Sequence, residues 1–184
     1  MINELFADVK DRMVKAVGHY SDEVAGIRTG RASINMLDSV KADYYGTPTP
    51  IRNMANVTVP EPQMIIIQAF DPTGLKAIEK AIRNSDLGLN PNNDGHVIRL
   101  NIPTLTDERR QQLIKVVHNL IEEGRVAIRN IRRDANDQLK KANNEHILSD
   151  DNLKRALDDV QEMTDKYIKE LNEVQTRKET EIKE

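Results

Sequence analysis

The chain has 184 residues, of which 31% are charged and 38% hydrophobic, with a formal net charge of −3. This length allows one or two domains, and the slightly acidic balance argues against a protein whose whole surface is basic and binds nucleic acid. The absence of cysteine excludes disulfides and zinc–thiolate sites, and an aromatic content of only 3% disfavours a module that stacks single-stranded bases on exposed rings.

A heptad pattern predicts an amphipathic helix over residues 2–28. Apolar residues recur in alternating steps of three and four, with polar residues between them. They are Ile2, Phe6, Val9, Met13, Ala16, Tyr20, Val24 and Ile27. We expect this helix to end near Thr29 and Gly30, because glycine readily takes the left-handed conformation that closes many helices.

Residues 31–105 differ in character, since proline, glycine and asparagine become frequent and the helical period disappears. The pattern predicts strands at 40–45, 57–59, 64–70 and 97–101, and a short helix at about 75–84. Pro60 and Pro62 are expected to separate the second strand from the third. Residues 46–50 are predicted as a turn and residues 88–93 as a loop. The segment therefore reads as a small mixed α/β unit.

The helical period returns after Thr106, a candidate N-cap, and continues to about Glu145. At about 100° per residue, this helix carries one narrow apolar stripe. The stripe consists of Leu113, Val117, Leu120, Gly124, Ile128, Ile131, Ala135 and Ala142. Ser149 is a second candidate N-cap, and a third apolar seam follows it to near the C-terminus.

Three long helices thus come from the two ends of the chain. Such helices are marginally stable alone, so we expect their seams to pack together as an elongated three-helix bundle. The predicted fold is α+β, with a bundle domain formed by residues 1–30 and 106–184. A small β/α/β domain formed by residues 31–105 is inserted into it. Two short connections join the domains, an arrangement that permits a hinge.

The second long helix also carries a row of arginines beside its apolar stripe. It consists of Arg125, Arg129, Arg132 and Arg133, and no acidic residue interrupts it. A guanidinium group can hold a phosphate through two parallel hydrogen bonds, and arginines spaced by about one helical turn, ~5.4 Å, can follow a folded phosphate backbone. The alternative is an ordinary charged helix face with partners one turn away. The residues alone leave both interpretations open.

No catalytic or cofactor motif is present: there is no P-loop, dinucleotide turn, metalloprotease motif or nucleophile elbow. The histidines lack metal-ligand spacing, so we expect neither a metal nor another cofactor. The chain also contains no apolar run of about 18 residues that could span a membrane, and no signal-peptide core at its start. We therefore expect a cytoplasmic protein.

Five segments carry motifs of a known family. They are residues 27–33, 43–50, 85–92, 105–110 and 126–137. In their order and spacing they closely resemble the bacterial ribosome recycling factor, and the resemblance extends over essentially the whole chain. It implies an L-shaped pair of domains joined by a flexible elbow, and a protein that is not an enzyme.

The resemblance also implies a role in protein biosynthesis after translation termination. The protein would bind the post-termination ribosome, with its bundle against large-subunit ribosomal RNA. Together with elongation factor G, which hydrolyses GTP, it would split the subunits and release messenger RNA and deacylated transfer RNA. We expect a monomer without membrane association.

Matching by position, the resemblance marks Arg132 as the main RNA-binding residue of the bundle, with Arg129 and Arg28 as companions. The helical projection adds Arg125 and Arg133, and Arg31 lies close to Arg28 in the chain. The expected hinge residues are Thr29, Gly30, Arg31, Pro103, Thr104, Leu105 and Thr106.

Two other functions are considered. An adaptor protein could use the helix seams to dimerise and the α/β unit to hold a protein partner, and sedimentation would distinguish such a dimer from a monomeric factor. An enzyme acting on phosphate esters is less well supported, because no general base or metal cluster is evident.

Overall fold

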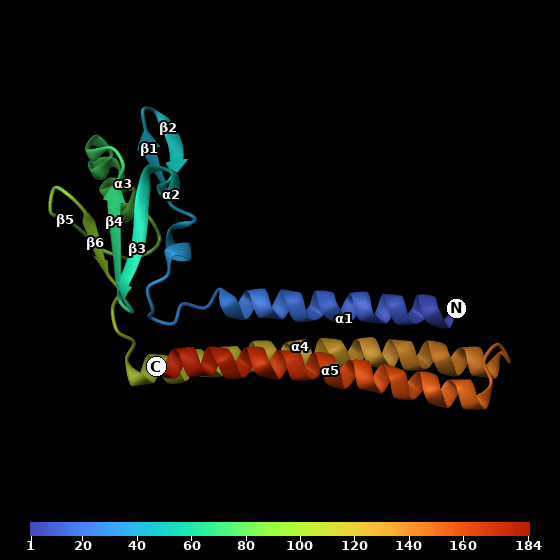
Figure 1. Cartoon of the computed structure of the whole chain (residues 1–184). Helices are drawn as coiled ribbons and strands as arrows, with labels where there is room; N and C mark the ends of the chain where they lie inside the picture. Colours follow the sequence, from blue (N-terminus) through green and yellow to red (C-terminus); the bar gives the residue numbers. More distant parts are fainter. The chain divides into compact units, whose positions relative to one another are not determined.

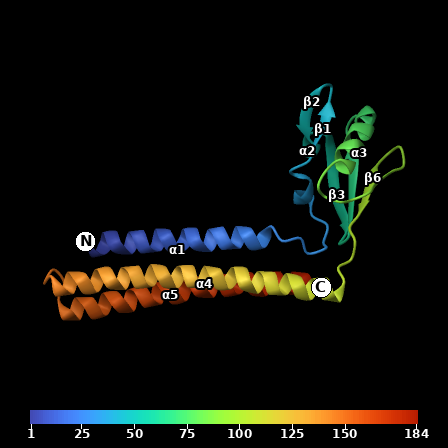
Figure 2. The ribbon, with the colours of Figure 1, turned by 180° about the vertical axis from the view of Figure 1, so that it is seen from behind.

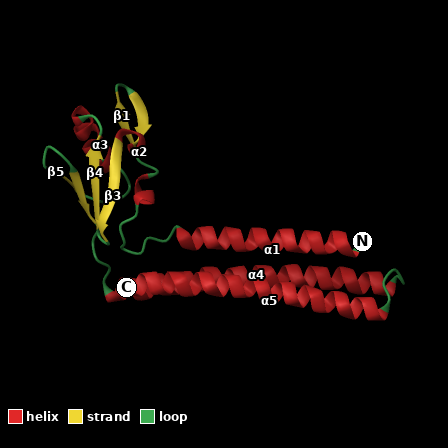
Figure 3. Ribbon diagram, in the orientation of Figure 1, coloured by secondary structure: helices red, strands yellow, loops and turns green.

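The structure is a computed structural model that describes all residues, 1–184, and it divides into two compact units. We call the first unit the bundle; it comprises Met1–Thr29 and Asp107–Glu184. The second, Gly30–Thr106, is the inserted unit. Figure 3 shows that the bundle is helical, whereas all strands lie in the inserted unit. Gly30 and Thr106, which the sequence prediction places in the bundle, belong here to the inserted unit.

The bundle consists of α1 (Ile2–Ala25), α4 (Asp107–Asn144) and α5 (Asp150–Lys183). The helices lie side by side along their lengths in both views (Figures 1 and 2), and each contacts the other two. Their shared core contains the fully buried side chains of Met13, Val117, Ile121, Ile128, Leu139, Val160 and Leu171. No helix of the structure is both long and apolar enough to span a membrane.

Two details of the predicted helices are wrong. The first helix ends at Ala25, where the N–H of Gly26 donates to the carbonyl of Asp22 and the N–H of Ile27 donates to that of Val24. Gly30 does have a positive φ of 76°, but it lies in the connector beyond the helix end. In α4, Ile121 is fully buried while Leu120 is partly exposed. The buried face of α4 is broader than the predicted stripe, because this helix packs against two neighbours rather than one.

The N-cap predicted for the third helix is confirmed. Ser149 has extended backbone angles, and its side-chain oxygen accepts a hydrogen bond from the backbone N–H of Asn152. The preceding turn is tight, since the backbone N–H groups of Ile147 and Leu148 both donate to the carbonyl of Ala142. This turn brings α5 back along α4, so the two helices are antiparallel neighbours.

Gly124 of α4 lies close to side chains of both α1 and α5. A Cβ atom at this position would lie 3.0 Å from Leu171 Cδ1 of α5 and 3.1 Å from the ring of Tyr20 in α1. Glycine in a helix interior costs about 1 kcal/mol relative to alanine. The close approach of the two neighbouring side chains explains why this position accommodates glycine.

The inserted unit is built on a four-stranded antiparallel sheet of order β3-β4-β6-β5. The strands are β3 (Ala55–Glu61), β4 (Met64–Ala69), β5 (Pro91–Asn93) and β6 (Ile98–Asn101). Helix α3 (Leu75–Arg83) contributes Ile78 and Ile82 to the same fully buried core as Ile65, Ile67 and Leu100 of the sheet. A separate hairpin of β1 (Lys41–Tyr44) and β2 (Thr47–Pro50) leads into the short helix α2 (Ile51–Met54).

Three strands of this unit contain proline, and the sequence prediction missed or shortened them. Residues 47–50, predicted as part of a turn, form strand β2, and the turn itself is Tyr45-Gly46, both with positive φ. Two-residue turns of this hand suit the twist of a hairpin. Strand β3 likewise runs through Pro60, and part of the predicted loop is strand β5. All three strands lie at sheet edges, where the missing N–H of proline disturbs no ladder.

We predict that Gly124→Val destabilises the bundle by about 1–3 kcal/mol, the usual cost of overpacking a filled core. The new methyl groups would press on Tyr20 and Leu171. Gly18→Val is the matched control, because Gly18 lies in α1 with nothing within 4 Å of its Cβ position. Urea unfolding measures both variants, and equal free energies of unfolding would contradict the packing account.

Candidate nucleic-acid interface

Arg125, the first member of the arginine row of Arg125, Arg129, Arg132 and Arg133, lies on the side of α4 that faces α5. Its position follows from contacts on either side of the helix. Arg125 reaches α5, whereas Asp134 pairs with Arg12 of α1 at 3.0 Å. The acidic residue that directly follows the row in sequence therefore lies on the α1 side, away from the guanidinium groups.

Arg125 is committed to holding α4 against α5. Its guanidinium donates to Asn172 Oδ1 at 2.9 Å and to Gln175 Oε1 at 2.6 Å, both on α5. A third bond runs to Glu122 Oε2 at 2.8 Å, and the side chain is only 16% exposed. These bonds engage all three guanidinium nitrogens, so Arg125 is a structural clamp and has little left to offer a ligand.

Arg129 is more loosely held. Its Nη1 lies 3.3 Å from Glu122 Oε1, and its side chain is 39% exposed. Glu122 thus faces two arginines. The hydrogen bond from Arg125, and secondarily that from Arg129, lowers the pKa of the Glu122 carboxyl. This carboxylate is therefore ionised throughout the neutral pH range. Arg125 and Arg129 thus match the second interpretation of the row, an ordinary charged helix face whose arginines have an acidic partner on the same helix.

Arg132 and Arg133 differ from the first two. Arg132 is half-buried and Arg133 exposed, and neither makes a hydrogen bond or ion pair in the structure. An arginine keeps its charge at any physiological pH and offers five N–H donors in a planar fork. The donors available for a phosphate are thus concentrated at the C-terminal half of the row.

Arg28 is not part of the row. It follows α1 next to Thr29, which bonds to Glu181 near the end of α5. Arg12, by contrast, is level with the row through its pair with Asp134. The helical residues from Arg12 to the end of α1 alone span about 20 Å. Within the bundle, Arg28 is therefore separate from the four arginines of the row, and Arg31 belongs to the inserted unit.

The first connector is short and anchored at both ends. Thr29 is buried, and its hydroxyl donates to Glu181 Oε1 at 3.0 Å within the bundle. Ala32 is held in the inserted unit, where its N–H donates to the carbonyl of Pro62 at 2.7 Å. Only Gly30 and Arg31 lie between these anchors.

The second connector is held in a similar way. The N–H of Ile102 donates to the backbone carbonyl of Gln63 at 2.8 Å, and the Thr104 hydroxyl donates to the Gln63 side chain at 3.2 Å. Helix α4 begins at Asp107. Leu105 packs on the other connector, because its Cγ would lie 2.8 Å from a Cβ placed on Gly30. These contacts leave few residues of each connector without a link to its surroundings.

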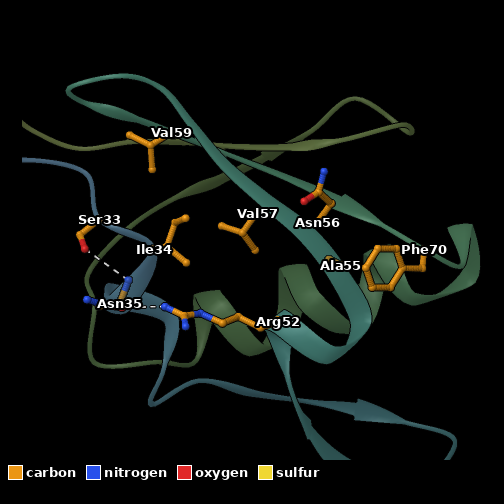
Figure 4. A pocket seen from close by; sticks show the side chains of 9 residues that line it. All are labelled: Ser33, Ile34, Asn35, Arg52, Ala55, Asn56, Val57, Val59 and Phe70. Atoms are coloured by element: carbon orange, nitrogen blue, oxygen red, sulfur yellow. Dashed lines mark hydrogen bonds between the residues drawn. The ribbon is translucent and has the colours of Figure 1, made fainter.

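A depression of about 650 Å³ lies beside strand β3 of the inserted unit (Figure 4). Ile34, Val57 and Val59 give it an apolar lining, and Phe70, 69% exposed, stands at its edge. Arg52 is occupied by Asn35, to which it donates at 2.7 Å, and by Asp38 at 3.0 Å. The lining contains no His, Asp, Glu or Lys side chain, and thus offers no general acid or base.

Comparison with known proteins decides the family. The family model described as "Ribosome recycling factor" matches residues 20–182. The ribosome-recycling factor of Syntrophomonas wolfei is 50% identical over 184 residues, and that of Symbiobacterium thermophilum 51% identical over 184 residues, each covering 100% of both chains. The chain belongs to the ribosome recycling factor family. Members of this family bind the ribosome in protein biosynthesis and are translation factors rather than enzymes.

Solved structures of this family have the same α+β fold. A solution structure of the ribosome recycling factor matches with a TM-score of 0.77 and 42% identity, covering 99% of this chain and 97% of that one. A second match, with a TM-score of 0.65, 47% identity and coverage of 99% and 98%, is a model of the Thermus thermophilus factor. In that work the T. thermophilus factor and Escherichia coli elongation factor G are bound to the E. coli post-termination complex.

Sequence reasoning missed Glu122 and its α5 neighbours. Glu122 stands three residues before Arg125 and seven before Arg129, so the helical spacing alone could have indicated both pairs. Asn172 and Gln175 gave no such signal, because they are distant in sequence and only the packing of α5 on α4 brings them to Arg125.

We predict that Arg125→Ala lowers the free energy of unfolding by about 1.5–3 kcal/mol, the range for hydrogen bonds to a charged group. The substitution removes the link between α4 and α5 and leaves Glu122 without its nearer partner. Arg133→Ala, at an exposed position without a partner, is expected to stay within about 0.5 kcal/mol of the wild type. Thermal and urea unfolding of the two variants would contradict the clamp if they lost equal stability.

Proposed function

We propose that the chain binds the post-termination ribosome and, together with elongation factor G, splits it into subunits. Messenger RNA and deacylated transfer RNA are released in this step, and the partner factor hydrolyses the GTP. Family membership supports the recycling role. The observation that carries the mechanism is the pair Arg132 and Arg133, two cations without partners on a helix of the bundle.

In this proposal the bundle is the anchor. Arg132 and Arg133 contact phosphates of large-subunit ribosomal RNA, and Arg129 contributes where it can leave Glu122. Contacts of this kind position a protein on RNA without reading its sequence. The packing of α4 supports the role, since Val117, Ile121 and Ile128 are fully buried and hold the helix firmly between α1 and α5.

The inserted unit acts as the lever. Elongation factor G pushes this unit, and the connectors at residues 29–31 and 103–106 form the hinge that lets it swing against the bundle. The anchors described above support this assignment, because Thr29 and Ala32 confine the motion of the first connector to Gly30 and Arg31. A hinge of few residues between rigid bodies transmits a push with little loss to internal deformation.

The factor acts as a cytoplasmic monomer in this proposal. The apolar seams of all three helices are filled from within the chain, so no seam is left for the second copy that an adaptor dimer needs. The large apolar residues exposed on the bundle, such as Val14, Val116 and Val126, are single positions among polar ones. Scattered residues of this kind do not form an interface.

We predict that Arg132→Ala weakens binding to post-termination ribosomes by about 10- to 150-fold, equivalent to the roughly 1.5–3 kcal/mol of a charged hydrogen bond. Its unfolding curve should match that of the wild type. Arg155→Ala is the matched control, since Arg155 is an exposed arginine of α5 without a partner. Sedimentation binding at several salt concentrations should also show a shallower salt dependence for Arg132→Ala, because fewer counterions are released.

We predict that Gly30→Ala slows subunit splitting while leaving ribosome affinity nearly unchanged. Alanine is strained at the φ of 76°, and its Cβ would meet Leu105 at 2.8 Å, so the connector loses its present conformation. The control is Gly18→Ala, an open position on α1. A normal splitting rate in Gly30→Ala, measured by light scattering, would remove Gly30 from the hinge.

The recycling role itself is tested by reconstitution. Purified post-termination complexes are mixed with the chain, elongation factor G from the same organism and GTP, and subunit separation is followed. Splitting that requires all three components and falls with Arg132→Ala supports the proposal. A folded chain that gives no splitting with a matched elongation factor would overturn it, and dimerisation in sedimentation would then favour the adaptor.

A further inference from the structure

Glu122 occupies a position on α4 that a phosphate group could take. One carboxylate oxygen accepts from Arg125 at 2.8 Å and the other from Arg129 at 3.3 Å. A phosphate bridging two arginines one turn apart would be held by the same pair of donors. The first two members of the row are therefore already neutralised by an acid of the same helix.

We infer that Glu122 is an internal competitor anion that blocks the N-terminal half of the arginine row and sets where its phosphate-binding face begins. The inference rests on the proposed binding of ribosomal RNA. It assigns to Glu122 a control of affinity and placement, in addition to the structural bond with Arg125. RNA phosphates then have direct access to Arg132 and Arg133, but reach Arg129 only by displacing the carboxylate.

The two hydrogen bonds of Glu122 differ in length and in exposure to solvent. In this inference the bond to Arg125 serves stability, and the bond to Arg129 affects RNA binding. The bond to Arg125 is short and that guanidinium is largely buried, so it persists when RNA binds. The bond to Arg129 is longer, and both side chains are substantially exposed, at 39% and 46%. Exposed ion pairs are weak, so Arg129 can exchange its carboxylate for a phosphate. Arg129 is the residue through which Glu122 influences binding.

Glu122 is the acidic residue that pairs with both Arg125 and Arg129, and the other acids nearby do not pair with them. Glu179 of α5 accepts a hydrogen bond from Gln175 rather than from an arginine of the row. Glu123 adjoins Glu122 in sequence, is exposed and has no ion-pair partner. It carries the same charge on the same turn of helix, and therefore serves as a matched control for the general effect of removing one negative charge.

The test is Glu122→Gln, which removes the charge but retains an oxygen that can accept from Arg125. Binding to purified post-termination ribosomes is measured over a range of salt concentrations. We expect the affinity to rise by about two- to fivefold at low salt, the equilibrium equivalent of one exposed ion pair. The slope of log affinity against log salt should steepen by about one, because one more phosphate is neutralised. Glu123→Gln should give a smaller gain and no change of slope.

Two further variants show whether the effect passes through Arg129. In an Arg129→Ala background, Glu122→Gln should no longer raise the affinity. Glu122→Asp keeps the charge on a shorter side chain and should raise it less than Glu122→Gln does, which provides a second reading if the amide lowers the stability of the bundle. Unchanged or weaker binding in both Glu122 variants, or an equal gain in Glu123→Gln, overturns the inference.

Arg132→Ala distinguishes this inference from the proposed function. If Arg132→Ala weakens binding while Glu122→Gln has no effect, the arginine anchor holds and only the role of Glu122 is wrong. If Arg132→Ala binds like the wild type, the arginine anchor itself fails and the inference fails with it.

Discussion

The close packing of α4 between α1 and α5 is the constraint on which the rest of this structure depends. Isolated helices of this kind are marginally stable in water, and burial of the shared apolar seam stabilises all three at once. The seam also determines what each side chain of α4 can do. At Gly124 the neighbours come so close that no side chain fits without a shift, and a few residues later the same helix presents charged groups to solvent.

This packing divides the arginine row into two functional halves. Arg125 lies near enough to α5 to be bonded there, and its charge contributes to the integrity of the bundle. Arg132 and Arg133 remain without partners and are available to a ligand. Glu122 pairs with Arg125 and Arg129, which form the first half, and not with Arg132 or Arg133. A row that looks uniform in sequence thus combines a structural clamp, a more exposed arginine that pairs with Glu122, and two arginines without a partner.

The inserted unit needs no active site for the role proposed here, and its features fit a mechanical part. A sheet and helix α3 share one buried core, and two short connectors lead from this unit into the bundle. Both connectors are tied to the same corner of the unit, through Pro62 and Gln63. This attachment agrees with the proposed hinge, in which the few remaining connector residues rotate and the core of the unit stays intact.

The sequence by itself determined the three long helices, the inserted α/β unit and the family, because heptad periodicity and family motifs are local patterns that survive without knowledge of contacts. It misjudged the end of α1, which lies before Gly26, and the proline-containing strands, where pairing with a neighbouring strand rather than local preference decides the conformation. Only the tertiary structure decided which arginines are available. Asn172 and Gln175 lie about fifty residues from Arg125 in the chain, and their hydrogen bonds to it exist only because α5 folds back along α4.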